Sequence, residues 1–184
     1  MQVTDFTIRS NEALNDRNRL IKVVPADHRH LLPMRPGQFV QVLVDRSPNT
    51  FLRRPISINF VDREQNELWL LVQEVGEGTR EICSRQPGET MNLIYPLGNS
   101  FTLPDGKGDR GGDRLEEECF ERGSRRREFH DVVHQEEEYN REDRFLLVGG
   151  GVGTAPLLFL GKELHARGLQ ADFLLGGRSV TDIL

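Results

Sequence analysis

The stretch Phe51-Leu-Arg-Arg-Pro-Ile-Ser-Ile-Asn59 is predicted to be an extended strand, because proline fixes φ and disfavours helix in the residue before it. Side chains at alternate positions of a strand share a face, so Arg54, Ile56 and Ile58 lie together. Ser57 then points to the other face unless a bulge re-aims it. A cation, an apolar side chain and a hydroxyl this close together suit a ligand with an anionic end and a polar-edged ring, such as a flavin dinucleotide. The same residues also fit an ordinary strand with a basic edge.

Short β-strands surround this stretch within residues 1–103. Alternating or apolar runs separated by turn residues predict strands over 3–8, 19–24, 38–44, 67–75 and 89–95. The polar residues 11–18 are predicted to form a turn between the first two strands. Strands of this length and spacing are typical of an antiparallel barrel or sandwich.

The tetrapeptide Gly76-Glu-Gly-Thr79 breaks the strand pattern and leads into a short helix predicted over 79–85. Gly78 lets the backbone approach a ligand closely, and Thr79 can cap the helix. The free N–H groups at a helix N-terminus form an anion site, which would hold a pyrophosphate alongside Arg54. Taken alone, the tetrapeptide is better explained as a plain turn between a strand and a helix.

Residues 104–143 are dominated by charge and contain few apolar side chains to bury, so we expect an exposed insertion or linker. Within it, His130-Asp-Val-Val-His134 has the spacing of zinc hydrolases, since histidines four apart share a helix face. Those enzymes carry glutamate where this chain has Asp131, and no folded scaffold is evident around the motif. A solvated charged face or a docking surface for a partner is the preferred interpretation, with zinc as the alternative.

Residues 144–184 predict a β-α-β unit. An apolar run over 144–148 is typical of a buried parallel strand, and Gly149-Gly-Gly-Val-Gly153 follows at once. A helix over 154–167 and a second strand over 171–175 complete the unit. A glycine turn at the carboxyl end of such a strand is where nucleotides bind in α/β sheets. The spacing departs from G-x-G-x-x-G, and tight packing alone could also explain the glycines.

Composition narrows the class of protein. With 184 residues, of which 36% are hydrophobic and 29% charged, the chain fits one large soluble domain or two small ones. A net charge of −5 argues against nucleic acid as a partner. No apolar run approaches the roughly 18 residues of a membrane helix, and the first residues lack the features of a signal peptide. We therefore expect a cytoplasmic protein that binds neither nucleic acid nor membrane.

The two cysteines, Cys83 and Cys119, are far apart and have no metal-ligand spacing. A disulfide framework is therefore not expected, which agrees with a reducing compartment. Two cysteines are also too few to hold an iron–sulfur cluster.

Four motifs occur in a fixed order along the chain: Arg54-Pro-Ile-Ser57, Gly76-Glu-Gly-Thr79, Pro96-Leu-Gly-Asn-Ser-Phe101 and Gly149-Gly-Gly-Val-Gly-Thr-Ala-Pro156. The set resembles the ferredoxin reductase-like flavoproteins, and among them the electron transfer subunits of class B dihydroorotate dehydrogenases. Each motif alone is weak, whereas the ordered set is fairly specific. The resemblance covers about two thirds of the chain and leaves the charged insertion unexplained.

The resemblance implies a six-stranded antiparallel Greek-key FAD-binding barrel over 1–103 and an incomplete Rossmann-like NAD-binding domain over 144–184. Arg54, with Pro55 beside it, would pair with the FAD phosphates, Ile56 would pack on the ring system, and Ser57 would be the catalytic residue beside flavin N5. Many relatives have tyrosine at the position of Ile56, and an aliphatic residue there favours the dihydroorotate group. The remaining cofactor-binding positions implied by the resemblance are Leu71, Val72, Gln73, Gly78, Thr79, Gly149, Gly150, Gly151 and Gly153.

The implied function is electron transfer in pyrimidine biosynthesis. NADH would reduce FAD, and a [2Fe-2S] cluster would pass single electrons to a catalytic subunit that carries FMN and oxidises dihydroorotate, within a hetero-oligomer. A reductase subunit serving a hydrogenase or sulfur metabolism remains an alternative. A non-catalytic barrel that only docks a partner is another.

Two departures from the family pattern accompany the resemblance. The family carries four cysteines for the [2Fe-2S] cluster in its C-terminal part, and this chain ends at Leu184, where the next helix would begin. The nucleotide domain has two of its usual five strands, which leaves an uncovered face. We therefore expect a shortened form in which FAD binding is retained while nicotinamide binding and onward electron transfer are in doubt.

Overall fold

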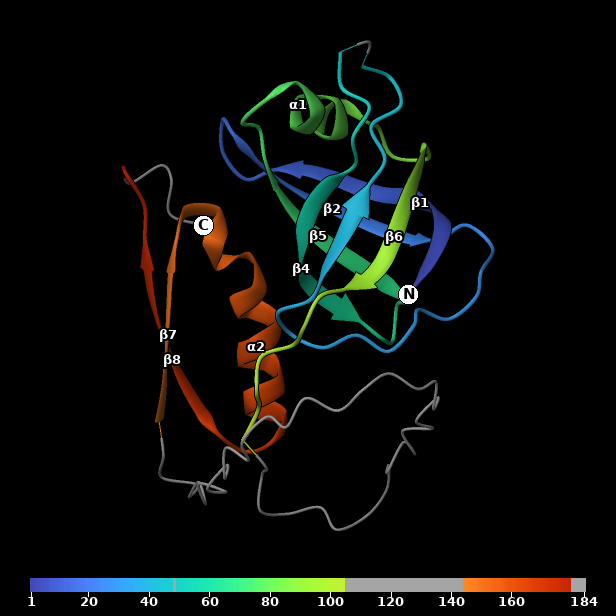
Figure 1. Cartoon of the computed structure of the whole chain (residues 1–184). Coiled ribbons are helices and arrows are strands. Elements are labelled where there is room, and N and C mark those ends of the chain that lie inside the picture. The colour runs from blue at the N-terminus through green and yellow to red at the C-terminus, as the bar shows by residue number, and fades with distance from the viewer. Residues whose placement is uncertain (48, 105–143, 180–184) are drawn as a thin grey trace, which may run out of the picture.

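Six antiparallel strands close into a barrel in this computed structural model, which describes residues 1–47, 49–104 and 144–179. The barrel order is β1-β2-β5-β4-β3-β6, and α1 lies at one end of it (Figure 1). This confirms the predicted barrel. The strands are β1 (Gln2–Ala13), β2 (Asn18–Pro25), β3 (Phe39–Val42), β4 (Arg54–Asp62), β5 (Glu67–Gln73) and β6 (Thr90–Leu97).

The barrel core follows from the alternation of apolar side chains along each strand. Fully buried members come from every strand, among them Phe6, Ile21, Val40, Ile58, Leu70 and Leu93. Each such side chain contributes about 1.5–3 kcal/mol of burial free energy, so the interior stabilises the barrel strongly.

The predicted turn over 11–18 is wrong for its first residues, because β1 continues to Ala13. There the strand pairs with β2, in a register that places Asn11 opposite Ile21. The Asn11 side chain also donates to the carbonyl oxygens of Cys83 and Arg85, at 2.8 and 2.7 Å. Polar residues that suggest a turn are thus held in a strand by hydrogen bonds to another element.

Helix α1 (Glu77–Ser84) is fixed to the barrel by the residue that follows it, Arg85. The Arg85 side chain is 2% exposed and donates to the carbonyl oxygen of Thr90 at 2.7 Å. Its guanidinium also pairs with Glu81 at 2.8 Å and with Asp45 at 2.5 Å. Because breaking a buried ion pair leaves an uncompensated charge, these contacts hold α1 in one place on the barrel.

Cys83 is a buried thiol that we predict to be unreactive in the folded protein. Its side chain lies in α1 at 2% exposure, and burial raises the pKa of the thiol from 9.0 to about 12. The neutral thiol is favoured in the fold, so this contribution to stability is present below pH 9.0 and is lost as the pH rises towards about 12. In a Cys119→Ser variant at about pH 8, Cys83 should resist iodoacetamide until denaturant is added, because thiolate is the nucleophile. Reaction at the unfolded rate would contradict this expectation.

The second unit is a β-α-β arrangement, as predicted. It comprises β7 (Arg144–Gly150), the 3-10 turn η1 (Gly151–Thr154), α2 (Ala155–Ala166) and β8 (Gln170–Gly176). Strands β7 and β8 pair in parallel, and α2 lies between this sheet and the barrel (Figure 1). On the other face of the sheet, Leu146, Val148 and Leu174 are exposed.

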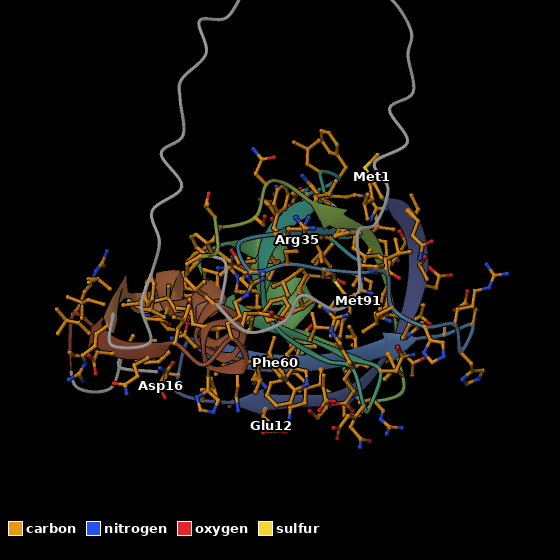
Figure 2. The ribbon with its side chains drawn as sticks, turned by 90° about the horizontal axis from the view of Figure 1, so that it is seen from below. Met1, Glu12, Asp16, Arg35, Phe60 and Met91 are labelled. Atoms are coloured by element: carbon orange, nitrogen blue, oxygen red, sulfur yellow. The ribbon has the colours of Figure 1, made fainter. Side chains whose placement is uncertain are left out.

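The barrel and α2 share a continuous apolar contact. Phe159 of α2 is 2% exposed and belongs to the same buried cluster as the barrel interior. Its ring meets Phe60 of β4 edge to face, with the ring centroids 6.0 Å apart. Phe60 lies between the barrel strands and α2 (Figure 2). The two units are therefore packed through aromatic side chains rather than joined only by the chain between them.

Two sequence-based hypotheses lie outside the described residues: the insertion beyond Pro104 and its His130/His134 zinc site. Within the residues that are described, no group of three or more His, Cys, Asp or Glu side chains is arranged to hold a metal ion. None of the described helices has the length and apolar character needed to cross a membrane.

Candidate functional site

The adjacent residues Arg53 and Arg54 have different surroundings. Arg53 donates to the carbonyl oxygens of Gln41 and Asn92, at 3.1 and 3.2 Å, and so ties β4 to its neighbours. Arg54 is half-buried, and its guanidinium makes no hydrogen bond or ion pair with any other described residue, although its backbone pairs with Val42 of β3. A guanidinium whose donors have no partner among the described residues can donate to an anionic ligand, so Arg54 is a candidate site for an anion from outside the chain.

Arg54 lies directly against Gly78 in the first turn of α1. A Cβ atom at Gly78 would sit 2.6 Å from Nε of Arg54 and 3.2 Å from the methyl group of Thr50. These distances are too short for a real side chain, so only glycine allows the arginine to occupy this place. The structure thus brings together Arg54 and Gly78, two residues that are 24 positions apart in the sequence.

No side chain caps the N-terminus of α1, which leaves N–H groups of its first turn for another acceptor. The helix begins at Glu77, two residues before the predicted start, so Thr79 is not its cap. Instead, the Thr79 hydroxyl accepts from the backbone N–H groups of Val75 and Gly76, at 2.9 and 3.1 Å. It orders the turn that precedes the helix.

Glu77 adds a negative charge at this helix start, and that charge is engaged by the loop before β4. Its carboxylate accepts from the Ser47 hydroxyl at 2.5 Å and from the Asn49 side chain at 3.3 Å. The hydrogen bond from Ser47 is the main reason that the pKa of Glu77 is lowered. The carboxylate therefore connects α1 to the loop.

Strands β4 and β5 separate next to Arg54. Their ladder begins at Ile58 opposite Leu70 and continues towards the hairpin. Before Ile58, residues 54–57 pair with β3, while residues 71–73 pair with β2. Because each segment is paired on its far side only, backbone groups on the facing edges are available to a ligand between them.

The other predicted residues of β4 fall on different sides of the strand. Ile56 is 8% exposed and belongs to the barrel core, so only a small part of its side chain can touch a ring outside the barrel. Pro55 is exposed and Ser57 half-buried. The contact of Ile56 with a ring system and the role of Ser57 stay predictions.

A pocket of about 520 Å³ lies where the far end of β5 meets two glycine turns, the one after β7 and a second one, Gly176-Gly177, at the end of β8. Gly150 and Gly151 line it, as does Gln73, which is also on the free edge of β5. Of the other predicted glycines, Gly149 packs against α2, where a Cβ would lie 2.6 Å from Leu157, and Gly153 has no atom within 4 Å of its Cβ position.

Two arginines on the wall of this pocket were missed by sequence reasoning. Arg17 comes from the β1–β2 turn and Arg178 from the turn after β8. Arg178 could have been found, because it follows the second strand of the β-α-β unit within the glycine turn Gly176-Gly177. Arg17 carries no local signal, and only the folded barrel brings it to the pocket.

Comparison with known proteins gives relatives that are electron transfer subunits of dihydroorotate dehydrogenase B. The sequence is 33% identical to the electron transfer subunit of dihydroorotate dehydrogenase B (NAD(+)) from Geobacillus kaustophilus over 141 residues, which are 77% of this chain and 42% of the relative. The corresponding subunit from Shouchella clausii is 31% identical over 148 residues, 80% of this chain and 44% of the relative. The chain is a homologue of these electron transfer subunits. No family model matches the sequence.

The resemblance to dihydroorotate dehydrogenase B electron transfer subunits that the four motifs predicted is therefore confirmed. The chain spans less than half the length of these curated relatives.

Solved structures support the fold. Phthalate dioxygenase reductase superposes with a TM-score of 0.65 at 21% identity, over 98% of this chain and 45% of that one. The FAD/NAD-binding domain of nitric oxide dioxygenase from Vibrio cholerae gives 0.68 at 16% identity, over 97% of this chain and 64% of that one. At these identities the likeness establishes the architecture, a barrel followed by an α/β unit, and nothing finer.

Proposed function

We propose that this chain is an FAD-binding electron-transfer flavoprotein. The observation that carries the proposal is the guanidinium of the half-buried Arg54, which has no partner among the described residues and packs on Gly78 in the first turn of a helix without a side-chain cap at its N-cap residue. A guanidinium and free N–H groups that converge on one place suit a diphosphate, because both donate to anionic oxygens. Arg54, Gly78 and the backbone near Thr79 would hold the FAD pyrophosphate.

The ring system of FAD would lie between β4 and β5. The free edges of residues 54–57 and 71–73 offer N–H and C=O groups to the polar rim of the ring. Ser57 would lie beside N5 and orient the reacting edge. FAD, when bound, supplies hydride acceptance and the release of single electrons, while the protein supplies binding and orientation.

NADH is the proposed electron donor, and the pocket at the glycine turns is its proposed site. Gly150 and Gly151 allow a close approach of the ligand to the backbone, and Gly151 has a φ of +52° that favours glycine. Arg17 and Arg178 bring two guanidinium groups to the same wall, which suits the diphosphate of a dinucleotide. Gln73 is on the wall of this pocket and on the proposed flavin edge, so the two sites are adjacent.

The proposed acceptor is a dihydroorotate dehydrogenase catalytic subunit that carries FMN, reached through a [2Fe-2S] cluster, within a cytoplasmic hetero-oligomer. The names of the homologues, electron transfer subunits of dihydroorotate dehydrogenase B, support the identity of this partner, while FMN, the cluster and the cytoplasmic location rest on the family resemblance. Among the described residues, no group of three or more His, Cys, Asp or Glu side chains is arranged to hold a metal ion.

Visible spectroscopy tests the proposal. The purified chain, or the chain after addition of FAD and gel filtration, should show flavin absorption bands without iron–sulfur shoulders. Anaerobic addition of NADH should then bleach these bands. A protein that stays colourless with excess FAD would favour the non-catalytic docking barrel instead. A flavoprotein that NADH does not bleach would leave FAD binding intact and reject the proposed donor.

A further inference from the structure

Asn59 makes a buried hydrogen bond between the two halves of the proposed site. Its side chain is 7% exposed, and Nδ2 donates to the carbonyl oxygen of Ala155 at 2.8 Å. The two residues are 96 positions apart in the sequence. Asn59 belongs to the strand that carries Arg54 and Ser57, whereas Ala155 is the first residue of α2.

Ala155 directly follows the glycine turn that lines the nucleotide pocket. Within that turn, the Thr154 hydroxyl donates to the carbonyl oxygen of Gly151 at 2.8 Å, and Gly151 is a pocket residue. The side chain of Asn59 is therefore connected to the pocket through two hydrogen bonds, from Nδ2 to Ala155 and from Thr154 to Gly151, joined by the peptide bond between Thr154 and Ala155.

Ser57 and Asn59 are two residues apart on β4, and the strand leaves its regular register between Ile58 and Phe60. This irregularity lets Asn59 be buried directly after the buried Ile58, where strict alternation would place one of the two outside. The neighbouring Phe60 contacts Phe159 of α2 through apolar rings, which packs the two units but does not define a register. The hydrogen bond of Asn59 is directional, so it fixes the position along β4 at which the glycine turn lies.

We propose that Asn59 is a positioning residue that sets the distance from the nucleotide turn to Ser57, and so aligns the nicotinamide of NADH with the flavin edge. This inference rests on the proposed function. Hydride transfer demands close approach of the reacting atoms, and a displacement of about 1 Å can reduce the rate by up to about 100-fold. The Asn59 amide therefore acts on the reaction without touching either reactant.

The test compares Asn59→Asp and Asn59→Leu with the wild-type chain, each loaded with FAD. The rate of flavin reduction at saturating NADH is measured by stopped-flow absorbance, and photoreduction of the flavin is measured in parallel because it bypasses the nucleotide pocket. Reduction by NADH should slow about tenfold or more in both variants, with photoreduction and flavin content unchanged.

The Asn59→Asp variant separates positioning from general loss of structure. At about pH 8 its carboxylate faces the Ala155 carbonyl and cannot donate, but at about pH 5.5 the protonated carboxyl can, since burial raises the pKa of a carboxyl group. Its rate of reduction relative to wild type should therefore recover as the pH falls. If Asn59→Leu does not fold, the recovery of the reduction rate of Asn59→Asp at low pH is by itself the test of the inference.

Asn66→Asp is the matched control. Asn66 lies in the β4–β5 hairpin, and its Nδ2 donates to the carbonyl oxygen of Arg29 at 2.9 Å, so the same change removes the same kind of bond. It should leave the rate at the wild-type value at both pH values. Wild-type reduction rates in the Asn59 variants, a proportional loss of photoreduction, or no recovery at low pH would overturn the inference. A wild-type flavoprotein that NADH fails to reduce would instead reject the proposed function, and the inference with it.

Discussion

Arg54→Ala should bind FAD about 100-fold more weakly than the wild-type chain. The substitution removes a charge-assisted donor from the proposed pyrophosphate site, and truncating one partner of such a pair costs about 2–5 kcal/mol. About 2.7 kcal/mol corresponds to a factor of about 100 in Kd. The measurement is the Kd of FAD from quenching of flavin fluorescence, together with the flavin content of the purified protein.

Arg53→Ala is the matched control, because the two arginines are neighbours in the sequence. Arg53 holds β3 and β6 through the carbonyl oxygens of Gln41 and Asn92, so its loss should lower the thermal unfolding temperature rather than the affinity for FAD. Arg54 has no such contacts with described residues, so Arg54→Ala should unfold near the wild-type temperature when FAD is absent. Full flavin content in Arg54→Ala would remove the observation on which the proposed function depends.

Gly78→Ala should also release FAD, with an affinity at least tenfold lower. The added methyl group would lie 2.6 Å from Nε and 3.3 Å from Cγ of Arg54, so the guanidinium must move away from the helix start. Alanine is the better helix former by about 0.5–1 kcal/mol, so the fold itself should not be weakened by helix propensity. The affinity is measured as for Arg54→Ala, in parallel with thermal unfolding of the protein without FAD.

Gly76→Ala provides the comparison for this variant. Gly76 precedes the same helix, but nothing lies within 4 Å of its Cβ position and its φ of −160° is open to any residue. FAD affinity should change by no more than about twofold, which corresponds to about 0.4 kcal/mol. Equal losses of FAD affinity in Gly78→Ala and Gly76→Ala would mean that FAD binding depends on the backbone of the turn and not on the contact of Gly78 with Arg54.

Much of the fold, and part of the candidate site, could be predicted from the sequence. Alternation along β4 places Ile56 and Ile58 inside the barrel, and the glycine turn after 144–148 predicts the β-α-β unit. These patterns are local, because side-chain direction in a strand and the chain reversal after glycine depend on nearby residues. The start of α1 was placed two residues late, since the threonine that suggested a cap bonds backwards to the turn instead.

The rest depends on contacts between distant segments. The motif selects Arg54, but the contacts that occupy Arg53 appear only in the fold, since the acceptors of Arg53 come from β3 and β6. The burial of Asn59 follows from an irregularity in the β4–β5 ladder, for which the residues give no signal. Arg17 reaches the pocket at the glycine turns only because the barrel closes.

The buried guanidinium of Arg85 has a consequence for motion. Eight residues are too few for a helix that is stable by itself, yet this one is bonded at its carboxyl end to Asp45 and Thr90 from two other segments. The amide hydrogens that are bonded within the helix, from Arg80 onward, should therefore exchange with solvent only when the whole barrel opens, whereas the unbonded N–H groups of its first turn should exchange sooner. A dinucleotide bound at the first turn of α1 would then dissociate without local unfolding of the helix.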